Sequence, residues 1–520
     1  MNNIRKIIFF ILLIAMTVIS VSTGFAYEEN DALGITVHIR HNINRHMARL
    51  QNKNGALLKV MPEEISKLDF NKYDTEELVL GTELYSFDDN LGSVFKYLLK
   101  GNIEDEISGD ENKVNTLSGS SYKVHSLIGL NGFPEIFACN TILRAATGGR
   151  AKLVSDFPEE IPKYQVIKNK NNIYVENIDF YNFSTIKFEY CENIIFNNCT
   201  FNDFSVNGLV FRDCENISVI NCNFNNCGNA MTDYTNSGYS IRITGDDTNP
   251  ANNVLIENCV IENACGDAIS FVGAVDNFIV RNNKINNSVW SAIDYWQPAI
   301  SGEYINIIEN NSCVNIGFGE PSKYDTAARV SGVGCSAIFA GKGMPMAKTI
   351  VKNNTIRNAV ENGIEGAYEL VYHNTIENTG ENSAVRHTGS TEGIFITPVV
   401  SFEQKYISNV IQTRGLRCIS SYSSEPDEYK AIYIIGNLFS LKDTDDSITC
   451  KYKRADIEIN YPHLKKLVIR GNTGMRCDID SVNIFIRDKE YAMEYFDLEN
   501  PCKIGVVPEC VKYCYNINVR

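Results

Sequence analysis

An asparagine recurs at one position of a pattern that this chain repeats seven times. Large apolar residues flank it in every copy, and one of them always stands three positions after it. Successive asparagines lie 21, 23, 37, 24, 29 and 42 residues apart, which indicates a unit of about 21–24 residues with insertions in some copies. A period of this size predicts a solenoid, in which each repeat packs on its neighbours. The recurring residues are Asn177, Asn198, Asn221, Asn258, Asn282, Asn311 and Asn353.

Within each unit the residue pattern favours strands over helices. Apolar and polar residues alternate with a period of two, and many of the apolar ones are β-branched or aromatic. Asparagine is the non-glycine residue that most readily adopts the left-handed backbone conformation needed at a sharp bend. We therefore expect the seven asparagines to stack at one bend of successive coils, where their side chains hydrogen-bond to one another.

The repeated segments, such as NIIFNNCTF (193–201) and NISVINCNF (216–224), resemble those of right-handed parallel β-helix proteins of the pectate-lyase-like superfamily. The resemblance covers about residues 115–475 and implies an all-β solenoid with three short strands in each coil. The superfamily includes lyases, hydrolases, epimerases and non-catalytic adhesins. The resemblance therefore implies the fold and leaves the function open.

The chain is predicted to have four parts. Residues 1–26 read as a secretory signal peptide, because Arg5 and Lys6 precede an apolar run and small residues stand at Gly24 and Ala26. Residues 27–114 lack the repeat and are expected to form an N-terminal cap or a small extra domain, ahead of the β-helix over 115–475 and a C-terminal cap over 476–520. No second long apolar stretch follows, so the mature protein is expected to be secreted and to have no membrane span.

The charge balance argues against a nucleic-acid partner. The full chain has 48 basic and 63 acidic residues, and removing residues 1–26 takes away Arg5 and Lys6 alone, so the net charge goes from −15 to 46 − 63 = −17. A chain this acidic does not bind nucleic acid by neutralising phosphates. It also repels a polyanionic glycan unless a local basic groove or a bound cation compensates.

Sixteen cysteines in an exported chain would ordinarily indicate disulfides. Many of them, however, fall on equivalent repeat positions, where stacked cysteines act as small buried apolar residues. Cys502, Cys510 and Cys514 lie outside the repeats and are better disulfide candidates, and no cysteine or histidine spacing indicates zinc. The cysteines on repeat positions are Cys191, Cys199, Cys214, Cys222, Cys227, Cys259 and Cys265.

A second repeated pattern in the sequence predicts that one side chain per coil lies on the outer face of a single sheet. After each bend comes a short strand with a small residue, an inward apolar residue and an outward residue. Coils stack about 4.8 Å apart, so Arg242 and Asp294 should lie two coils and about 10 Å apart, as should Asp294 and Glu365. The predicted outward residues are Val210, Arg242, Ser270, Asp294, Phe339, Glu365 and Phe395.

Insertions on both sides of this sheet predict loops that wall a groove, and long loops in repeat proteins usually serve binding. Both tryptophans of the chain, Trp290 and Trp296, fall in this region. Aromatic rings beside carboxylates and basic groups suit a polysaccharide, whose sugar rings stack while their polar edges hydrogen-bond. The candidate substrate-binding residues are Trp290, Trp296, Tyr324, Arg329, Lys342, Arg386 and His387.

Two cleavage mechanisms fit these residues, and a third reading is binding without turnover. Hydrolysis needs two carboxylates, and Asp294 with Glu365 or Asp267 with Asp294 is a candidate pair. β-Elimination needs a base and a positive charge, for which Arg242, Arg329, Lys342, Arg386 and His387 are candidates. Asp246 and Asp247 are candidate Ca²⁺ ligands, although two aspartates before Thr-Asn-Pro also suit an ordinary turn. Asp267 also fits a plain strand start, and a non-catalytic surface or adhesive β-helix is the alternative function.

Overall fold

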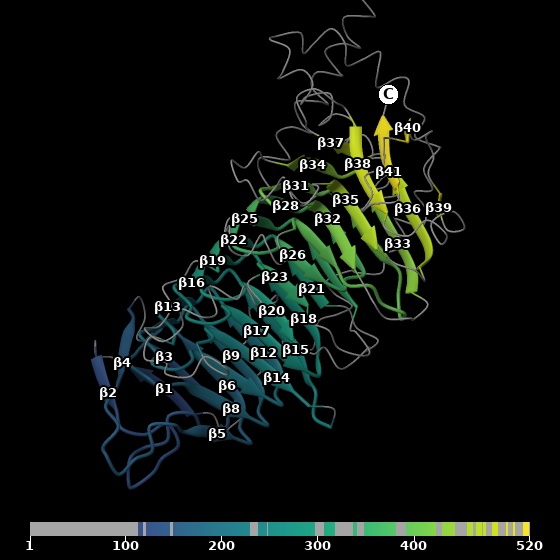
Figure 1. Cartoon of the computed structure of the whole chain (residues 1–520). Helices are drawn as coiled ribbons and strands as arrows, with labels where there is room; N and C mark the ends of the chain where they lie inside the picture. The colour runs from purple at the N-terminus through teal and green to yellow at the C-terminus, as the bar shows by residue number, and fades with distance from the viewer. Residues whose placement is uncertain are drawn as a thin grey trace, which may run out of the picture.

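In the part of the chain that the structure describes, the fold consists of short strands stacked along one long axis (Figure 1). The computed structural model describes residues 113–117, 121–145, 149–228, 238–246, 248–296, 306–317, 336–340, 348–380, 392–415, 417–422, 429–441, 455–460, 464–470, 472–474, 481–486, 496–497, 503–504 and 513–518. The predicted signal peptide and almost all of the predicted N-terminal part lie outside these residues, so the predicted domain boundaries stay predictions. No helix in the described part of the chain is long and apolar enough to cross a membrane.

From β3 to β38 each coil contributes one strand to each of three sheets, which we call sheets 1, 2 and 3. Sheet 1 contains β1 (Lys113–Leu117), β3 (Thr141–Ala145), β6 (Asn171–Glu176), β9 (Glu192–Asn197), β12 (Glu215–Ile220), β15 (Ala251–Glu257), β18 (Val275–Arg281), β21 (Asn306–Glu309), β24 (Thr349–Lys352), β27 (Leu370–Tyr372), β30 (Gln404–Ile407), β33 (Tyr429–Ile435), β36 (Leu464–Arg470) and β39 (Phe496–Asp497).

Sheet 2 contains β2 (Ser121–Val124), β4 (Ala151–Ser155), β7 (Ile178–Tyr181), β10 (Thr200–Asn202), β13 (Asn223–Asn225), β16 (Val260–Glu262), β19 (Lys284–Ser288), β22 (Ser312–Ile316), β25 (Thr355–Ala359), β28 (Thr375–Thr379), β31 (Val410–Thr413), β34 (Leu438–Leu441) and β37 (Thr473–Gly474). Sheet 3 contains β5 (Val166–Lys168), β8 (Ile186–Glu189), β11 (Leu209–Arg212), β14 (Ile241–Gly245), β17 (Ile269–Gly273), β20 (Ile293–Trp296), β23 (Ile338–Ala340), β26 (Ile364–Gly366), β29 (Ile394–Ile396), β32 (Arg417–Tyr422), β35 (Ala455–Asn460), β38 (Ser481–Ile486), β41 (Tyr513–Asn518) and β40 (Lys503–Ile504).

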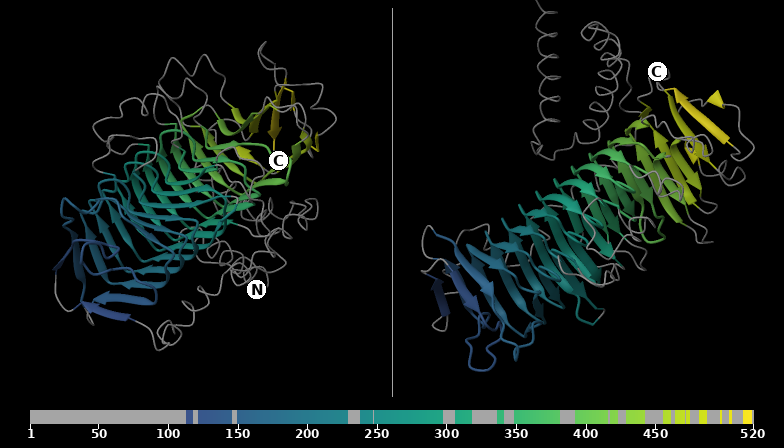
Figure 2. Two further views of the ribbon diagram at one scale, coloured as in Figure 1. Left: turned by 90° about the horizontal axis from the view of Figure 1, so that it is seen from below. Right: turned by 60° about the vertical axis from the view of Figure 1, so that its left-hand side comes forward.

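From β3 to β38 the chain passes from sheet 1 to sheet 2 to sheet 3 and then back to sheet 1. Figure 2 shows the resulting stack of strands from two further sides. Neighbouring strands pair in parallel along the solenoid, and only β41 pairs antiparallel, with β38 and β40, among the described strands. Crossovers between parallel strands are right-handed in nearly all proteins. The predicted fold, a right-handed parallel β-helix, is therefore confirmed. Strand β38 also extends sheet 3 into the segment expected to be a C-terminal cap.

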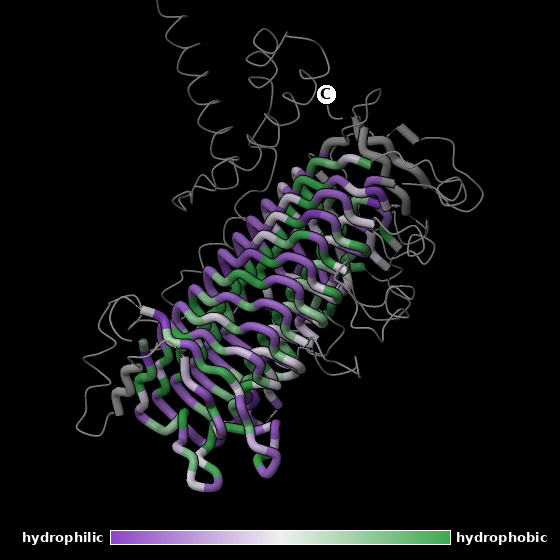
Figure 3. Tube along the Cα trace, turned by 90° about the vertical axis from the view of Figure 1, so that its left-hand side faces the viewer, coloured by the Kyte–Doolittle hydropathy of each residue, from purple (hydrophilic) through white to green (hydrophobic). Residues whose placement is uncertain are grey.

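Inward side chains fill the solenoid as columns of like residues. Hydrophobic and hydrophilic residues alternate along the coils, as Figure 3 shows. Phe180, Phe201 and Phe224 are register partners on sheet 2, and their rings stack with centroids 5.2 and 4.5 Å apart. All three are almost fully buried. Aromatic pairs at this spacing stabilise a core beyond the area they bury, by about 0.5–1.5 kcal/mol each.

The asparagine bends occur where the sequence predicts, with one exception. Six of the seven predicted residues have φ between 51° and 59°, the left-handed region that asparagine tolerates. Asn198 donates from Nδ2 to Oδ1 of Asn177 at 2.6 Å, as predicted, whereas Asn221 donates to Oδ1 of Asn197 and not to that of Asn198. The prediction for Asn311 is wrong, because Asn310 takes the bend in that coil, with φ of 55°. Two adjacent asparagines made the register ambiguous by one residue.

Asn311 instead belongs to a second, buried ladder that the sequence reasoning missed. Asn283 donates from Nδ2 to Oδ1 of Asn311 at 2.9 Å, and Asn311 donates in the same way to Asn354 at 3.0 Å. Each Nδ2 also reaches a backbone carbonyl, so these buried amides are well satisfied. The ladder runs through Asn283, Asn311, Asn354, Asn374, Asn409, Asn437 and Asn472.

Cys199, Cys222 and Cys259 occupy this inner position in the preceding coils, and the backbone N–H of Cys259 donates to Oδ1 of Asn283 at 2.8 Å. All three side chains are fully buried, as predicted, and are free thiols in the structure. Burial raises the pKa of Cys199 and of Cys222, which favours the neutral thiol. Under denaturing, non-reducing conditions we expect all three to react with an alkylating reagent. Resistance of all three until a reductant is added would contradict this expectation.

Candidate functional site

The predicted outward residues of sheet 3 do form one continuous column. Register pairs join each to the next across successive strands from β11 to β29. The predicted two-coil separations are therefore confirmed: Ser270 lies between Arg242 and Asp294, and Phe339 lies between Asp294 and Glu365. The column is Val210, Arg242, Ser270, Asp294, Phe339, Glu365 and Phe395.

All residues of this column point outward, but not all of their side chains are exposed to solvent. The sequence predicted that Asp294 faces a solvent-exposed trough, but its side chain is only 7% exposed, and Ser270 is buried as well. The Ser270 hydroxyl lies 3.4 Å from Oδ2 of Asp294. The predicted exposure is wrong because strand alternation sets only the direction of a side chain, whereas burial depends on everything packed around it. The loops predicted to wall a groove here lie largely outside the described residues.

Asp267 lies one coil before Asp294, two residues ahead of β17, and is 4% exposed. Its Oδ1 accepts a hydrogen bond from the backbone N–H of Ser291 in the next coil at 2.8 Å. Asn207 and Asn362 make the same kind of contact elsewhere on this edge of sheet 3: each Oδ1 accepts a backbone N–H from the following coil. An amide can thus replace the carboxyl in the coil-to-coil contact, so the contact alone does not explain a carboxyl at position 267.

Burial shifts the protonation of both carboxyls, and the charge of Asp267 adds to the shift of Asp294. Burial raises the pKa of Asp267 to about 7, although the Ser291 N–H and the charge of Arg242 lower it. Burial also raises the pKa of Asp294 well above its usual range, and the charge of Asp267 raises it further, against smaller lowering effects of Ser270 and Arg242. Two carboxyls in adjacent coils with little solvent cannot both ionise readily. Both carboxyls are therefore harder to ionise than an ordinary aspartate.

Arg242 and Tyr239 complete the N-terminal side of this cluster. The Arg242 guanidinium lies over the Tyr239 ring, 4.5 Å from its centroid, in cation–π geometry. Burial raises the pKa of Tyr239 to about 12, and the charges of Asp267 and Asp294 contribute to the shift. Sequence reasoning missed Tyr239 because it stands at the edge of an insertion.

Glu365 is half-buried and held by two neighbours on the same face. Its Oε2 accepts hydrogen bonds from the Ser336 hydroxyl at 2.5 Å and from Nδ2 of Asn362 at 2.8 Å. The Tyr368 hydroxyl donates to the Glu365 backbone carbonyl at 2.9 Å. The carboxylate is thus fixed in one orientation by neutral donors. A strand-register argument finds Glu365, but it does not find Ser336 or Asn362, which lie before the strands.

An aromatic pair adjoins Asp294 on the C-terminal side. Trp296 is 48% exposed and stacks with Phe339, with ring centroids 5.9 Å apart and planes 22° apart. The other predicted binding tryptophan, Trp290, is half-buried just before β20. The exposed indole is an apolar surface beside the buried carboxyls, as a stacked sugar ring would require.

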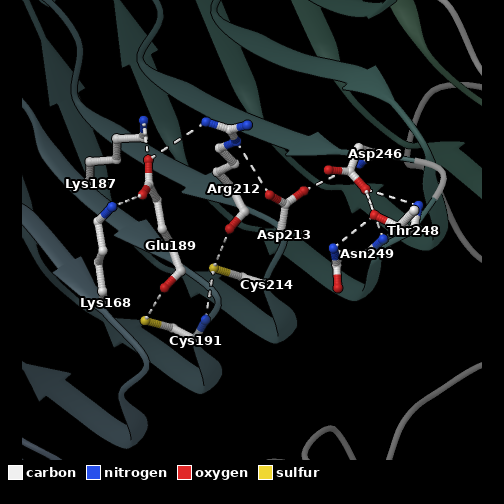
Figure 4. Close-up of polar contacts among 10 residues, drawn as sticks. All are labelled: Lys168, Lys187, Glu189, Cys191, Arg212, Asp213, Cys214, Asp246, Thr248 and Asn249. Carbon is white, nitrogen blue, oxygen red and sulfur yellow. Dashed lines mark hydrogen bonds and ion pairs between the residues drawn. The ribbon is translucent and has the colours of Figure 1, made fainter.

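Asp246 directly follows β14 of sheet 3 and is one of the polar residues drawn in Figure 4. Its Oδ1 accepts hydrogen bonds from the backbone N–H groups of Thr248 and Asn249 and from the Thr248 hydroxyl, and these contacts lower the pKa of Asp246. This arrangement is an ordinary aspartate turn. Asp247, the other predicted Ca²⁺ ligand, lies outside the described residues. No group of three or more metal-ligating side chains is found in the described ranges, and the Ca²⁺ prediction stays a prediction.

The same neighbourhood contains a charged cluster that the sequence analysis did not single out. Lys168 and Lys187 lie 2.8 and 2.6 Å from the carboxylate of Glu189, and Arg212 pairs with Asp213 at 3.2 Å. A second missed cluster lies toward the C-terminal end, where buried Arg417 bridges Glu392 at 3.0 Å and Glu458. Lys168 with Glu189, and Arg417 with Glu392 and Glu458, pair charges from different coils, which no local sequence pattern signals. The other predicted binding or catalytic residues lie outside the described part of the chain: Tyr324, Arg329, Lys342, Arg386 and His387.

Replacing Asp267 with asparagine should make stability depend less on pH. Its pKa is raised from 3.8 to about 7 in the folded state, so between about pH 4 and 7 the folded chain keeps a proton that the unfolded chain has lost. This carboxyl's stabilising contribution is therefore complete below about pH 4 and is lost as the pH rises. We expect Asp267→Asn to match the wild type near pH 4 and to exceed it near pH 8 by a few kcal/mol, at about 1.4 kcal/mol per pKa unit. Urea unfolding at both pH values measures this; an equal difference at both would contradict it.

Comparison with known proteins gives structural likeness at low identity. No protein-family model and no curated protein sequence matches the chain. The Streptococcus pneumoniae surface adhesin PfbA is 12% identical with a TM-score of 0.38, and the match covers 81% of this chain and 94% of the adhesin. An alginate lyase from Paenibacillus sp. str. FPU-7 is 11% identical with a TM-score of 0.32, covering 59% of this chain and 91% of the lyase.

A family 28 exopolygalacturonase from Yersinia enterocolitica is 10% identical with a TM-score of 0.32, and the match covers 74% of this chain and 73% of that enzyme. These values are too low to carry a function or a residue role from any of the three proteins. The three parallel sheets of the chain itself define its class. The chain is a right-handed parallel β-helix protein.

Proposed function

We propose that the protein is a secreted polysaccharide-active enzyme that hydrolyses a glycan on the outer face of sheet 3, between β14 and β26. The observation that best supports this is the buried pair Asp267 and Asp294 in adjacent coils of sheet 3, in which burial raises the pKa of both carboxyls and the charge of Asp267 raises that of Asp294 further. A carboxylic acid with a raised pKa can donate its proton to the leaving oxygen of a glycosidic bond. Secretion rests on the predicted signal peptide at residues 1–26.

In this proposal Asp294 is the general acid, and Glu365 is the second carboxylate. Two coils separate them, which corresponds to about 10 Å between strands. This is close to the range of about 6.5–9.5 Å in which an inverting glycosidase accommodates a water molecule between its carboxyls. Ser336 and Asn362 hold the Glu365 carboxylate in place, as a base that orients water requires.

The neighbouring residues have supporting roles. Trp296 and Phe339 offer a stacked aromatic surface on which a sugar ring can lie. Arg242 supplies positive charge two coils before Asp294 and limits the repulsion between the carboxyls. Asp267 acts through Asp294, as a positioning residue that sets its protonation. The net charge of −17 on the mature chain still disfavours nucleic acid as the partner.

Hydrolysis is preferred over β-elimination because the column on sheet 3 carries two carboxyls, and burial raises the pKa of one of them, Asp294, as a general acid requires. The positive charge near them, Arg242, lies over the Tyr239 ring. β-Elimination leaves an unsaturated sugar that absorbs ultraviolet light, whereas hydrolysis does not. The two reactions are therefore distinguishable from their products.

Incubating the mature protein with a panel of plant, algal and animal polysaccharides tests the proposal. We expect new reducing ends from at least one polysaccharide without the ultraviolet absorbance of an unsaturated sugar. Reducing ends that appear together with this absorbance would replace hydrolysis by β-elimination. Retention on an immobilised polysaccharide without cleavage of any member would support the non-catalytic binding function and overturn the enzymatic one.

A further inference from the structure

We infer that the outer face of sheet 3 has an anion-binding subsite toward its N-terminal end, and that the glycan carries carboxylate or sulfate groups. The subsite lies several coils before Asp294, apart from the bond that is cleaved. This inference rests on the proposed function, because it assigns a substrate class to the same face. The residues of the subsite are Tyr164, Lys168, Lys187 and Arg212.

A second column of outward side chains runs along sheet 3 beside the column of Asp294. Register pairs join its members over five steps from β5 to β20, which corresponds to about 24 Å. Apart from Glu189 its members are partly or fully exposed, whereas Ser270 and Asp294 in the neighbouring column are buried. A linear polymer can therefore lie along this accessible column. Its members are Lys168, Glu189, Arg212, Thr244, Val272 and Trp296.

At the N-terminal end of this column the cations are exposed and their carboxylate partners are buried. The side chains of Lys168 and Arg212 are 54% and 47% exposed, whereas those of Glu189 and Asp213 are 8% and 1% exposed. Glu189 pairs with both Lys168 and Lys187, so one buried carboxylate holds two ammonium groups (Figure 4). A ligand that arrives from the solvent therefore meets positive groups before negative ones.

One exposed carboxylate, Asp246, also lies near these cations. Its Oδ1 is already occupied by three hydrogen bonds from Thr248 and Asn249, and it stands after the end of β14 rather than on the column. Burial and the charge of Asp246 raise the pKa of Asp213, which makes this second buried carboxyl harder to ionise. The carboxyls around the column thus leave its exposed cations available to an anionic ligand.

An exposed aromatic ring adjoins the cations. Tyr164 stands two residues before β5 and is 50% exposed, and Nζ of Lys187 lies 5.7 Å from the centroid of its ring. An aromatic ring beside positive charges suits a sugar that bears an anion, because the sugar ring stacks while the anion pairs with the cations. Trp296 offers a second ring at the other end of the column.

The overall charge of the protein makes a local basic surface necessary for an anionic glycan. The net charge of −17 on the mature chain repels a polyanion. Exposed cations on the face that is proposed to bind glycan reduce this repulsion where the polymer lies. Because Lys168 and Arg212 are exposed, their attraction should weaken as salt concentration rises.

Affinity electrophoresis of the full mature chain with Asp294→Asn tests this inference, because removal of the proposed acid keeps the polymers intact. The gels contain hyaluronate or polygalacturonate, which carry carboxylates, carrageenan or dextran sulfate, which carry sulfates, or the neutral polymers dextran and laminarin. We expect at least one anionic polymer to retard the protein, and the neutral polymers to retard it less. The polymers that bind distinguish a carboxylate ligand from a sulfate ligand.

Adding Lys168→Gln should weaken binding of the anionic polymer about tenfold or more, the usual effect of losing a charged contact. Glu189 keeps Lys187 as its partner in this variant, so the fold should be retained, and thermal unfolding verifies this. Lys284→Gln is the matched control, because Lys284 is an exposed lysine on sheet 2 and its loss changes the net charge equally. Tyr164→Ser provides a second variant and should also weaken binding.

Failure to bind any anionic polymer, equal or stronger binding of the neutral polymers, or equal affinity of the Lys168→Gln and Lys284→Gln variants would each overturn the subsite. Cleavage of a neutral polysaccharide by the wild type, without binding of the anionic ones, would overturn the subsite and leave hydrolysis in place. Binding that depends on Lys168, without cleavage of any polysaccharide, would support the subsite and overturn the enzymatic function.

Discussion

Replacing Asp294 with asparagine should lower the rate of glycan cleavage by about 10²–10⁴-fold, the usual cost of removing a general acid. Asparagine has nearly the same shape but cannot give a proton to the leaving oxygen. The substitution also removes a buried group whose ionisation is unfavourable, so the fold should be kept or slightly stabilised. Initial rates on the polysaccharide that the wild type cleaves measure the effect, and circular dichroism verifies the fold.

Asp276→Asn is the matched control for this variant. Asp276 is also a buried aspartate, and burial raises its pKa to about 6, but it lies on sheet 1 rather than sheet 3. Its replacement should leave cleavage unchanged. Full activity of Asp294→Asn, or an equal loss in both variants, would remove Asp294 from the mechanism. Loss in Asp294→Asn with full activity in Glu365→Gln would retain the acid and reassign the second carboxylate.

Replacing Asn374 with alanine should lower the free energy of unfolding by several kcal/mol. The fully buried Oδ1 of Asn374 accepts from the backbone N–H and from Nδ2 of Asn354, and its Nδ2 donates to the Val351 carbonyl and to Oδ1 of Asn409. Each buried polar group left without its partner costs about 1–3 kcal/mol. Urea unfolding of the mature chain measures the loss.

Asn223→Ala is the control for the ladder, because Asn223 is an exposed asparagine on the outer face of sheet 2. Surface substitutions of this kind usually change stability by under about 0.5 kcal/mol. A loss of under about 1 kcal/mol for Asn374→Ala would mean that the neighbouring amides find other partners. The buried ladder would then not be a main source of stability.

The fold was predictable because the same physical requirement repeats in every coil. A left-handed bend needs asparagine, and an inward position needs an apolar residue, so Asn198, Asn221 and Asn258 all mark one bend. The buried ladder of Asn354 and Asn374 was missed because an inward asparagine looks identical in sequence to an outward one. The two differ by a single residue of register, and only the observed φ angles and hydrogen bonds distinguish them.

The candidate site was predictable in its register but not in its environment. Period-two alternation correctly placed Arg242, Asp294 and Glu365 on one column of sheet 3. It could not predict that Asp294 is buried, because burial results from contacts between coils. For the same reason Ser336 and Asn362, which hold Glu365 from other coils or from outside its strand, had no sequence signal.

Difference infrared spectroscopy of the wild type against Asp294→Asn tests the central claim most directly, because it requires no substrate. A protonated carboxylic acid has a carbonyl stretching band that an ionised carboxylate lacks. We predict that the difference spectrum of the wild type minus Asp294→Asn shows this band at pH 7. The difference spectrum of the wild type minus Asp276→Asn should show much less of it at pH 7, because the pKa of Asp276 is raised only to about 6. Absence of the band from the Asp294→Asn difference spectrum at pH 7, with its appearance only near pH 4, would show an ordinary ionised aspartate and would contradict the proposed acid.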